Sequence, residues 1–398
     1  MAALSEANLT GRLRIGSAML IRKPNIRLLP AVCDVSVTHA CNAACDFCGF
    51  ARQKRAGLKR HWIDCSALAR GLQFLRRRGV KYLGVQGGEP LLHPEVDRII
   101  ADAVEAGMRV ALVTNGWLLP NKVDAIADAG LRTLTVSLDS GNVATHEQNR
   151  GLSGLTTRIQ QGLERASRYQ IFRIASITVN RLLEFEELPE MLSRLGFQTL
   201  TFSYPRSEPL GSSSLAYGNG SSLVNFSADE QIGMLDSIER LKATFPVLNP
   251  SAGLQEIQRH LRGEPEIFPC VGGYEYFYID WNLNVWRCEA WHEPMAPLLE
   301  FDRFADQRDR CTACTMSCYR DTSVLMHAGI AARDAASHLR HGEPLKALSA
   351  LFSKSVAASR GAIFQEARVV APLAGIRMPR HAENPGNGSG SGRDHSQP

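Results

Sequence analysis

The sequence lacks a long apolar run: no segment approaches the roughly eighteen residues that a membrane-spanning helix needs. It also lacks a signal-type apolar core at its N-terminus, and nothing in it resembles a nucleic-acid-binding module. Hydrophobic residues make up 44% and charged residues 21% of the 398 residues, which is ordinary for a soluble globular chain. The net charge of +5 comes with basic runs at 52–60 and 76–78, which we interpret as a solvated face rather than an anionic-substrate rim. We therefore expect a cytoplasmic protein with no membrane span and no nucleic-acid partner.

The ten cysteines do not form the pattern of a disulfide framework, because six of them fall into two tight groups with metal-type spacing. The groups are Cys41, Cys45, Cys48 and Cys311, Cys314, Cys318, while Cys33, Cys65, Cys270 and Cys288 stand apart. This usage argues for a reducing compartment. Cys33 lies in a strand-like segment and Cys65 in a helix-like segment, and both are interpreted as core residues.

The first cysteine group has the spacing C-x3-C-x2-C, with an aromatic residue before the last cysteine. Three thiolates from one short loop can hold three irons of a [4Fe–4S] cube and leave the fourth iron open. Soft thiolate ligands also suit zinc, but a closed zinc site needs a fourth ligand. The nearest candidates, His39 and His61, do not have a familiar zinc spacing. The spacing favours an iron–sulfur cluster, with a zinc loop or unrelated core cysteines as the alternatives.

Strand-like and helix-like segments alternate between residues 31 and 205. The candidate strands are 31–38, 81–86, 109–114, 131–138, 173–179 and 199–204. The candidate helices are 65–78, 95–106, 122–129, 156–169 and 187–195, and Asp64 could cap the first of them. This alternation predicts right-handed βαβ units and a parallel sheet, so the fold class is α/β.

The cysteine loop follows the first candidate strand, and Gly87-Gly88-Glu89-Pro90 follows the second. In this order the two motifs resemble the radical S-adenosylmethionine (SAM) superfamily. The resemblance implies a partial (β/α)6 TIM-like barrel, in which Cys41, Cys45 and Cys48 hold the cluster and the glycine-rich stretch binds the amino group of SAM. It also implies that an electron from a flavodoxin- or ferredoxin-type donor cleaves SAM reductively. The resulting 5′-deoxyadenosyl radical would remove a hydrogen from the substrate.

Polar residues at the strand ends fit SAM, because parallel α/β folds bind ligands at the carboxyl ends of their strands. Gly87 and Gly88 would let the ligand approach the backbone, and the Glu89 carboxylate could take the ammonium group. The resemblance places further contacts to SAM at Asn115, Ser137, Asp139, Arg150 and Asn180. An adenine-binding Gly-x-Ile-x-Gly motif is missing from the fifth strand.

The remaining cysteines flank a hairpin-like stretch centred on residues 282–284, with Cys270 before it and Cys288 at its end. Together with a later C-x-x-C this resembles the SPASM/twitch extension of radical SAM enzymes, although a glycine is common there at the position of Leu283. The resemblance implies one auxiliary [4Fe–4S] cluster. Its expected ligands are Cys270, Cys288, Cys311 and Cys314, with Cys318 as a competing ligand. A zinc ribbon is the alternative.

The length allows one large domain and a smaller one. Residues 206–226 are rich in Gly, Pro and Ser and predict a loop or lid, and a capping box at Ser227 and Glu230 predicts the helix that follows. Residues 322–372 predict helices with an apolar stripe from Leu345 to Val356 that we expect to dock on the barrel. The expected division is an N-terminal extension (1–30), the barrel (31–205), a loop and helical connection (206–264), the iron–sulfur module (265–321), C-terminal helices (322–375) and a disordered tail (376–398).

The first functional hypothesis is a radical SAM enzyme that oxidises a small molecule or forms a bond in it. The second is a peptide-maturing enzyme, although the thirty residues before the first strand leave little room for a leader-binding domain. The third is a non-catalytic iron–sulfur electron carrier or sensor, against which the SAM-type motif argues. No cobalamin-binding domain is apparent, which disfavours cobalamin-dependent methylation.

Overall fold

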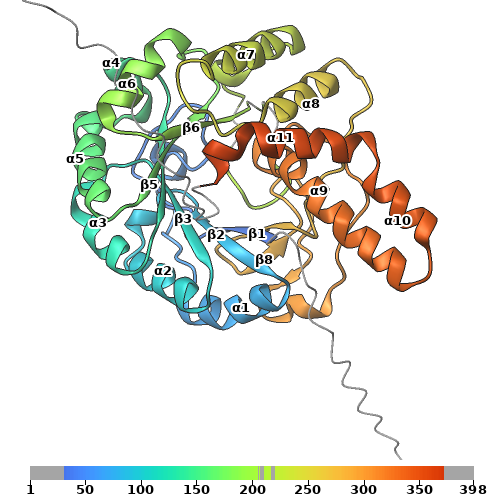
Figure 1. Ribbon diagram of the computed structural model, residues 1–398. Helices are drawn as coiled ribbons and strands as arrows, with labels where there is room; N and C mark the ends of the chain where they lie inside the picture. Colours follow the sequence, from blue (N-terminus) through green and yellow to red (C-terminus); the bar gives the residue numbers. More distant parts are fainter. Residues whose placement is uncertain (1–30, 205, 207–209, 217–219, 372–398) are drawn as a thin grey trace, which may run out of the picture.

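The computed structural model describes residues 31–204, 206, 210–216 and 220–371 (Figure 1). The expected N-terminal extension (1–30) and disordered tail (376–398) lie outside these residues. No helix among the described residues combines the length and the apolar character that crossing a membrane would require.

Six parallel strands form the body of the sheet in the order β6-β5-β4-β3-β2-β1, as expected for a partial TIM-like barrel (Figure 1). They are β1 (Ala31–Ser36), β2 (Val80–Gln86), β3 (Arg109–Thr114), β4 (Thr133–Leu138), β5 (Phe172–Thr178) and β6 (Thr199–Ser203). The helices between them are α1 (Cys65–Arg77), α2 (Val96–Glu105), α3 (Leu119–Asp128), α4 (Val143–Arg150), α5 (Leu155–Arg168) and α6 (Leu188–Leu195). The strands confirm the expected ones to within two residues at each end, whereas α4 was not anticipated.

Local signals explain how the barrel helices begin and what they bury. Asp64 caps α1, since its carboxylate accepts a hydrogen bond from the Ala67 amide at 2.9 Å. Leu68, Leu72 and Leu75 recur on one face of α1 and are at most 2% exposed, so this face packs into the core. Cys33 and Cys65 are also buried in this core, which confirms their interpretation as core residues.

The hairpin of the C-terminal segment joins the barrel sheet directly. Strand β7 (Tyr276–Ile279) pairs in parallel with β1, with Val32 opposite Tyr276, and β8 (Asn284–Trp286) and β9 (Ala296–Pro297) continue the sheet to nine strands. Leu283 in the β7–β8 turn has a positive φ of 65°, a conformation that suits glycine better. The sequence predicts the hairpin but not its pairing with β1.

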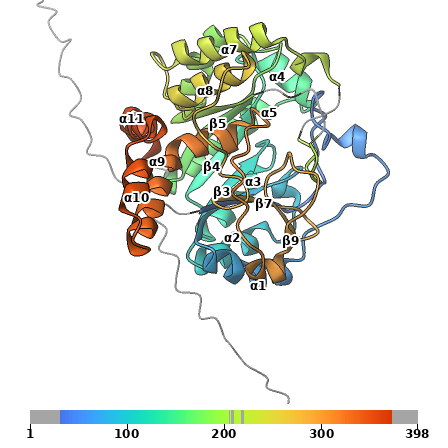
Figure 2. The ribbon, with the colours of Figure 1, turned by 90° about the vertical axis from the view of Figure 1, so that its right-hand side faces the viewer.

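The C-terminal helices α7 (Ala228–Leu241), α8 (Ser251–Leu261), α9 (Ser317–Arg340), α10 (Pro344–Leu351) and α11 (Lys354–Val370) follow the barrel strands. Ser227 and Glu230 form the expected capping box at α7. Figure 2 shows α10 and α11 stacked along α9 on one side of the molecule.

The expected docking of the apolar stripe on the barrel is wrong for α10. Leu345 is 81% and Phe352 79% exposed, and only Val356 at the start of α11 is buried, at 4%. The helix packs on α9 through Ala347, which is 2% exposed, so the leucines of α10 face outward. Periodicity indicates that a face is apolar without indicating what covers it.

Candidate functional site

A cavity of about 490 Å³ opens where the ends of the six parallel strands, β7 and the start of α9 meet. Small polar side chains of alternating strand positions face it, because residues two apart on a strand share a face. These are Ser36 on β1, Gln86 on β2, Thr135 and Ser137 on β4, Ser176 and Thr178 on β5, and Thr201 and Ser203 on β6, whereas the alternating positions of β3 are Ala111 and Val113. The arrangement offers hydroxyl groups to a polar ligand from β1 and from the three neighbouring strands β4, β5 and β6.

Cys41, Cys45 and Cys48 all line this cavity, on the loop that follows β1. Burial raises the pKa of the Cys41 thiol to about 12 and raises the pKa of the other two thiols as well. In the described part of the chain, no three Cys, His, Asp or Glu side chains are close enough to share one metal ion. A [4Fe–4S] cube binds each thiolate at a different iron, so three thiols spread along one loop suit a cube.

The two glycines after β2 keep the cysteine loop close to the sheet. Gly87 has a φ of +132°, and a Cβ there would lie 2.4 Å from the Thr38 carbonyl oxygen. A Cβ on Gly88 would lie 2.3 Å from the Ala40 carbonyl oxygen. The Gly88 and Glu89 amides donate to these same two carbonyls at 2.9 and 2.8 Å. The two glycines therefore leave room for the backbone of the cysteine loop to approach closely. Both also line the cavity, as expected.

Glu89 is placed differently from the direct ammonium contact that the sequence suggests. Its side chain is fully buried, and its carboxylate accepts hydrogen bonds from the Leu91 amide (3.0 Å), the Thr114 hydroxyl (2.6 Å) and the Asn115 amide (2.7 Å). Burial raises the pKa of this carboxyl, and the three donors oppose the rise. Glu89 thus joins the end of β2 to the end of β3 and positions Asn115, which does line the cavity.

The Glu89→Gln variant distinguishes these two roles. A glutamine amide would set an NH₂ donor against Thr114 or Asn115 and leave a buried donor unpaired, at a cost of about 1–3 kcal/mol. We expect the free energy of unfolding in urea to fall by that amount and SAM affinity to fall with it. A loss of SAM affinity at unchanged stability would instead support direct contact with the ammonium group.

Arg150, at the end of α4, lines the cavity and forms a two-bond ion pair with Asp139, which follows β4. Its Nε and Nη2 atoms donate to the two Asp139 carboxylate oxygens at 2.9 and 2.5 Å. Burial alone would raise the pKa of Asp139, but the guanidinium outweighs it and holds the pKa below its usual value. The Arg150 carbonyl also accepts the Ala44 amide at 2.8 Å, which ties this ion pair to the cysteine loop.

The expected SAM residues therefore divide into two layers. Gly87, Gly88, Asn115, Ser137 and Arg150 line the cavity. Glu89, Asp139 and Asn180 lie buried behind them, where the Asn180 side-chain amide donates to the Asp139 carbonyl at 2.9 Å. The structure brings all eight together around one site, with three of them buried behind the five that line the cavity.

The C-terminal cysteines gather beside the β7–β8 hairpin. The Cys270 amide donates to the Cys311 carbonyl at 3.1 Å, and the proximity of Cys314 adds to the rise in pKa that burial causes at Cys270 and Cys288. Arg287, next to Cys288, binds both oxygens of Asp309 at 2.6 and 2.7 Å and so holds the hairpin against the segment that leads to Cys311. The expected four ligands are thus neighbours in one cluster of side chains.

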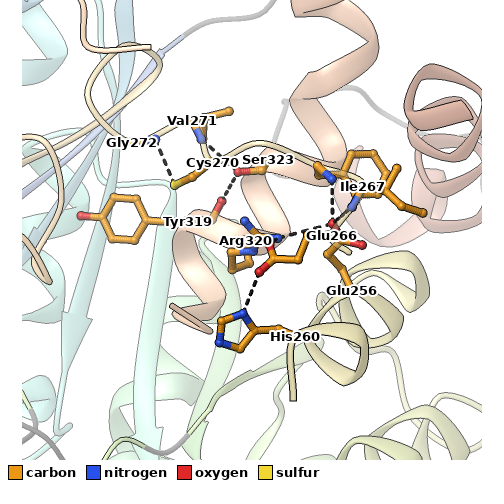
Figure 3. Close-up of polar contacts among 11 residues, drawn as sticks. Glu256, His260, Glu266, Ile267, Cys270, Val271, Gly272, Tyr319, Arg320 and Ser323 are labelled. Carbon is orange, nitrogen blue, oxygen red and sulfur yellow. Dashed lines mark hydrogen bonds and ion pairs between the residues drawn. The ribbon is translucent and has the colours of Figure 1, made fainter. Parts of the chain in front are cut away.

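Helix α9 anchors the Cys270 segment from below (Figure 3). The Val271 amide donates to the Ser323 hydroxyl at 3.1 Å, and that hydroxyl donates to the Tyr319 carbonyl at 2.6 Å. The Gly272 amide points at the Cys270 sulfur at 3.3 Å. One turn of α9 therefore fixes the backbone directly after this thiol.

A buried ionic network supports the same segment from α8 (Figure 3). Arg320, 2% exposed, contacts Glu266 and lies 3.4 Å from Glu256, whose carboxylate also accepts the Phe268 amide at 2.6 Å. His260 lies 2.7 Å from the Glu266 carboxylate. The network holds α8, α9 and the segment before Cys270 in one arrangement.

Two residues that the sequence reasoning missed line the cavity: Asp34 on β1 and Glu289 after β8. Burial raises the pKa of Asp34 to about 6 and that of Glu289 to about 7, and the charge of Asp34 adds to the rise at Glu289. A signal for Asp34 was present, since Asp34 and Ser36 alternate as polar residues on one face of an otherwise apolar strand. Cys318, at the start of α9, lies near Cys314 and also lines the cavity that Cys41, Cys45 and Cys48 line.

Comparison with known proteins matches residues 35–195 to the radical SAM superfamily model. The chain is 36% identical over 121 residues to an AdoMet-dependent heme synthase of Methanosarcina barkeri, covering 30% of this chain and 35% of that one. It is 34% identical over 169 residues to a GTP 3′,8-cyclase of Stenotrophomonas maltophilia, covering 40% and 50%. The chain thus spans between about a third and half of the length of these curated relatives.

Among solved structures, Streptococcus suis SuiB matches with a TM-score of 0.54 at 12% identity, over 70% of this chain and 67% of that one. At this identity the likeness concerns the fold. The family match runs from the end of β1 to α6 and so includes the cysteine loop and the cavity residues at the ends of β2 to β5. With this architecture and this match, residues 35–195 form a radical SAM domain, the domain of a superfamily of enzymes that use a [4Fe–4S] cluster and SAM.

Proposed function

We propose that this protein cleaves SAM reductively at a cluster held by Cys41, Cys45 and Cys48, and that it abstracts a hydrogen atom from a small molecule. The observation that carries the proposal is that the three thiols open on the same cavity as the hydroxyl-lined ends of the strands. A cavity of about 490 Å³ lies within the range of roughly 300–1,000 Å³ that is usual for small-molecule sites.

The fit to the cofactors follows from the donor set of the cavity. When bound, the cluster and SAM would supply a 5′-deoxyadenosyl radical that can attack an unactivated C–H bond. The three thiols would hold the cluster, and Asn115, Ser137 and Arg150 present hydrogen-bonding groups for the polar ends of SAM. Glu89 and Asp139 hold these groups in place from behind. The protein's contribution is to position these groups.

We further infer that residues 265–321 form a module with a second [4Fe–4S] cluster, on Cys270, Cys288, Cys311 and Cys314. Two observations favour this second cluster. The four thiols lie in one cluster of side chains, and α9 holds the segment around Cys270 through Ser323 and Arg320. A second cluster could take an electron from the substrate radical, which suits oxidation. All ten cysteines are free, which fits a reducing compartment such as the cytoplasm and an electron donor of the flavodoxin or ferredoxin type.

Cleavage of SAM by the full-length protein tests the proposal. The chain is reconstituted anaerobically with iron and sulfide, reduced with dithionite and incubated with SAM, and 5′-deoxyadenosine is measured by chromatography. We expect 5′-deoxyadenosine and methionine to form in equal amounts and only with the reductant. A reconstituted, reducible cluster that leaves SAM intact would contradict the proposal.

A further inference from the structure

The wall of the cavity that β1, β2 and the C-terminal segment share carries two carboxylates, Asp34 and Glu289. Asp34 lies on β1, and its Oδ2 accepts a hydrogen bond from the Tyr276 hydroxyl of β7 at 2.7 Å. The facing position on β2 is Gly84, where a Cβ would lie 2.0 Å from Asp34 Oδ1. A glycine inside a strand is unfavourable by itself, so here it makes room for the carboxylate.

Glu289 is 8% exposed, and its Oε1 accepts hydrogen bonds from the Gln86 side-chain amide at 3.1 Å and the Ser214 hydroxyl at 3.2 Å. All of its partners are neutral. Within the described residues, neither Glu289 Oε2 nor Asp34 Oδ1 has a hydrogen-bond donor. Each carboxylate is therefore held by one oxygen and has the second oxygen available to a ligand.

The charges around the cavity are unbalanced. Among the described residues that line it, Arg150 is the one Lys or Arg side chain, and both oxygens of Asp139 already bind it. The carboxylates are Asp34, Glu289 and Asp321, and the last is held by the Asn249 side-chain amide at 2.7 Å. Two carboxylates that repel each other in a poorly solvated wall are stabilised by a cation between them.

We propose that the substrate carries a protonated nitrogen, as a primary amine or a guanidinium, and that the free oxygens of Asp34 and Glu289 bind it. The inference rests on the proposed function and names the substrate class of the same cavity. Charge-assisted hydrogen bonds to a carboxylate are about twice as strong as neutral ones, so this pair would set both orientation and specificity. A nucleoside triphosphate would meet these carboxylates with no unpaired cation among the described lining residues, and the cavity disfavours it.

Titration calorimetry on the full-length, anaerobically reconstituted protein with SAM tests the proposal. The probes are agmatine, cadaverine and GTP. We expect the two cations to bind and GTP neither to bind nor to compete. In the double variant Asp34→Asn, Glu289→Gln, which keeps the size of both side chains, the affinity for agmatine should fall about tenfold or more, since ionic hydrogen bonds are lost.

The matched control is Glu300→Gln, Asp302→Asn on the 3-10 helix Leu298–Arg303, which makes the same change in net charge away from the cavity. It should leave agmatine affinity unchanged, and the iron content of the double variant shows whether its cluster site is intact. Binding of GTP in the cavity, binding of neither cation, or equal agmatine affinity in the double variant would each overturn the proposal. An assay of SAM cleavage without substrate distinguishes a failure of the proposed function from a failure of the proposed substrate class. If SAM is cleaved and no cation binds, only the substrate class is wrong.

Discussion

Changing Cys41, Cys45 and Cys48 to alanine is expected to abolish SAM cleavage and to halve the iron content. With two [4Fe–4S] cubes the reconstituted protein should hold about eight irons per chain, and the variant about four. The thiols line the cavity, and although Cys45 also packs in the core, each change removes a single sulfur atom, so the fold should survive their loss. Iron is measured by a colorimetric assay, and 5′-deoxyadenosine by chromatography.

The matched control is the pair Cys33→Ala, Cys65→Ala, which removes two cysteines that lie in the core, at 0% and 6% exposure. It should retain about eight irons and SAM cleavage. Residual 5′-deoxyadenosine in the triple variant would show that the first cluster is elsewhere. If the triple variant holds no iron, or zinc in its place, the wild-type protein has one cluster, and the C-terminal cysteines form a structural metal ribbon instead of a second cluster.

The second large effect is expected from Asp139→Asn, which keeps the shape of the side chain but removes its charge. Arg150 is 8% exposed, and breaking a buried ion pair by removing one partner costs about 3–5 kcal/mol of unfolding free energy. Urea denaturation at neutral pH measures this loss. Because Arg150 also lines the cavity and its carbonyl holds Ala44, we expect weaker SAM binding as well.

The pH dependence of this loss follows from the lowered pKa of Asp139. A depressed carboxyl pKa stabilises the fold above the unfolded value, near 4, and this stabilisation is lost as pH falls through the folded value. The difference between wild type and Asp139→Asn should therefore be full at neutral pH and shrink in acid. The control Glu164→Gln disrupts an exposed ion pair with Arg168 and should change little, and an equal loss there would contradict the assignment.

The sequence predicts the barrel well because its signals are local. Alternation marks β1 to β6, and Asp64 and Ser227 mark helix starts through contacts within three residues. Two features were predicted wrongly or not at all, because they depend on contacts between segments that are distant in the sequence. Whether the Glu89 carboxylate faces a ligand or the Asn115 amide depends on the packing of a neighbouring strand, and the outward stripe of α10 depends on where α9 lies.

The pairing of β7 with β1 has a consequence for how the chain folds. Val32 and Tyr276 are partners across the sheet, so one edge of β1 stays open until the chain has grown past β7. At a synthesis rate of about 5–20 residues per second, this takes roughly ten to fifty seconds. During that time the nascent barrel exposes an unpaired strand edge, the feature through which sheets aggregate. Expression at low temperature with chaperones should therefore raise the yield of folded protein more than added iron alone.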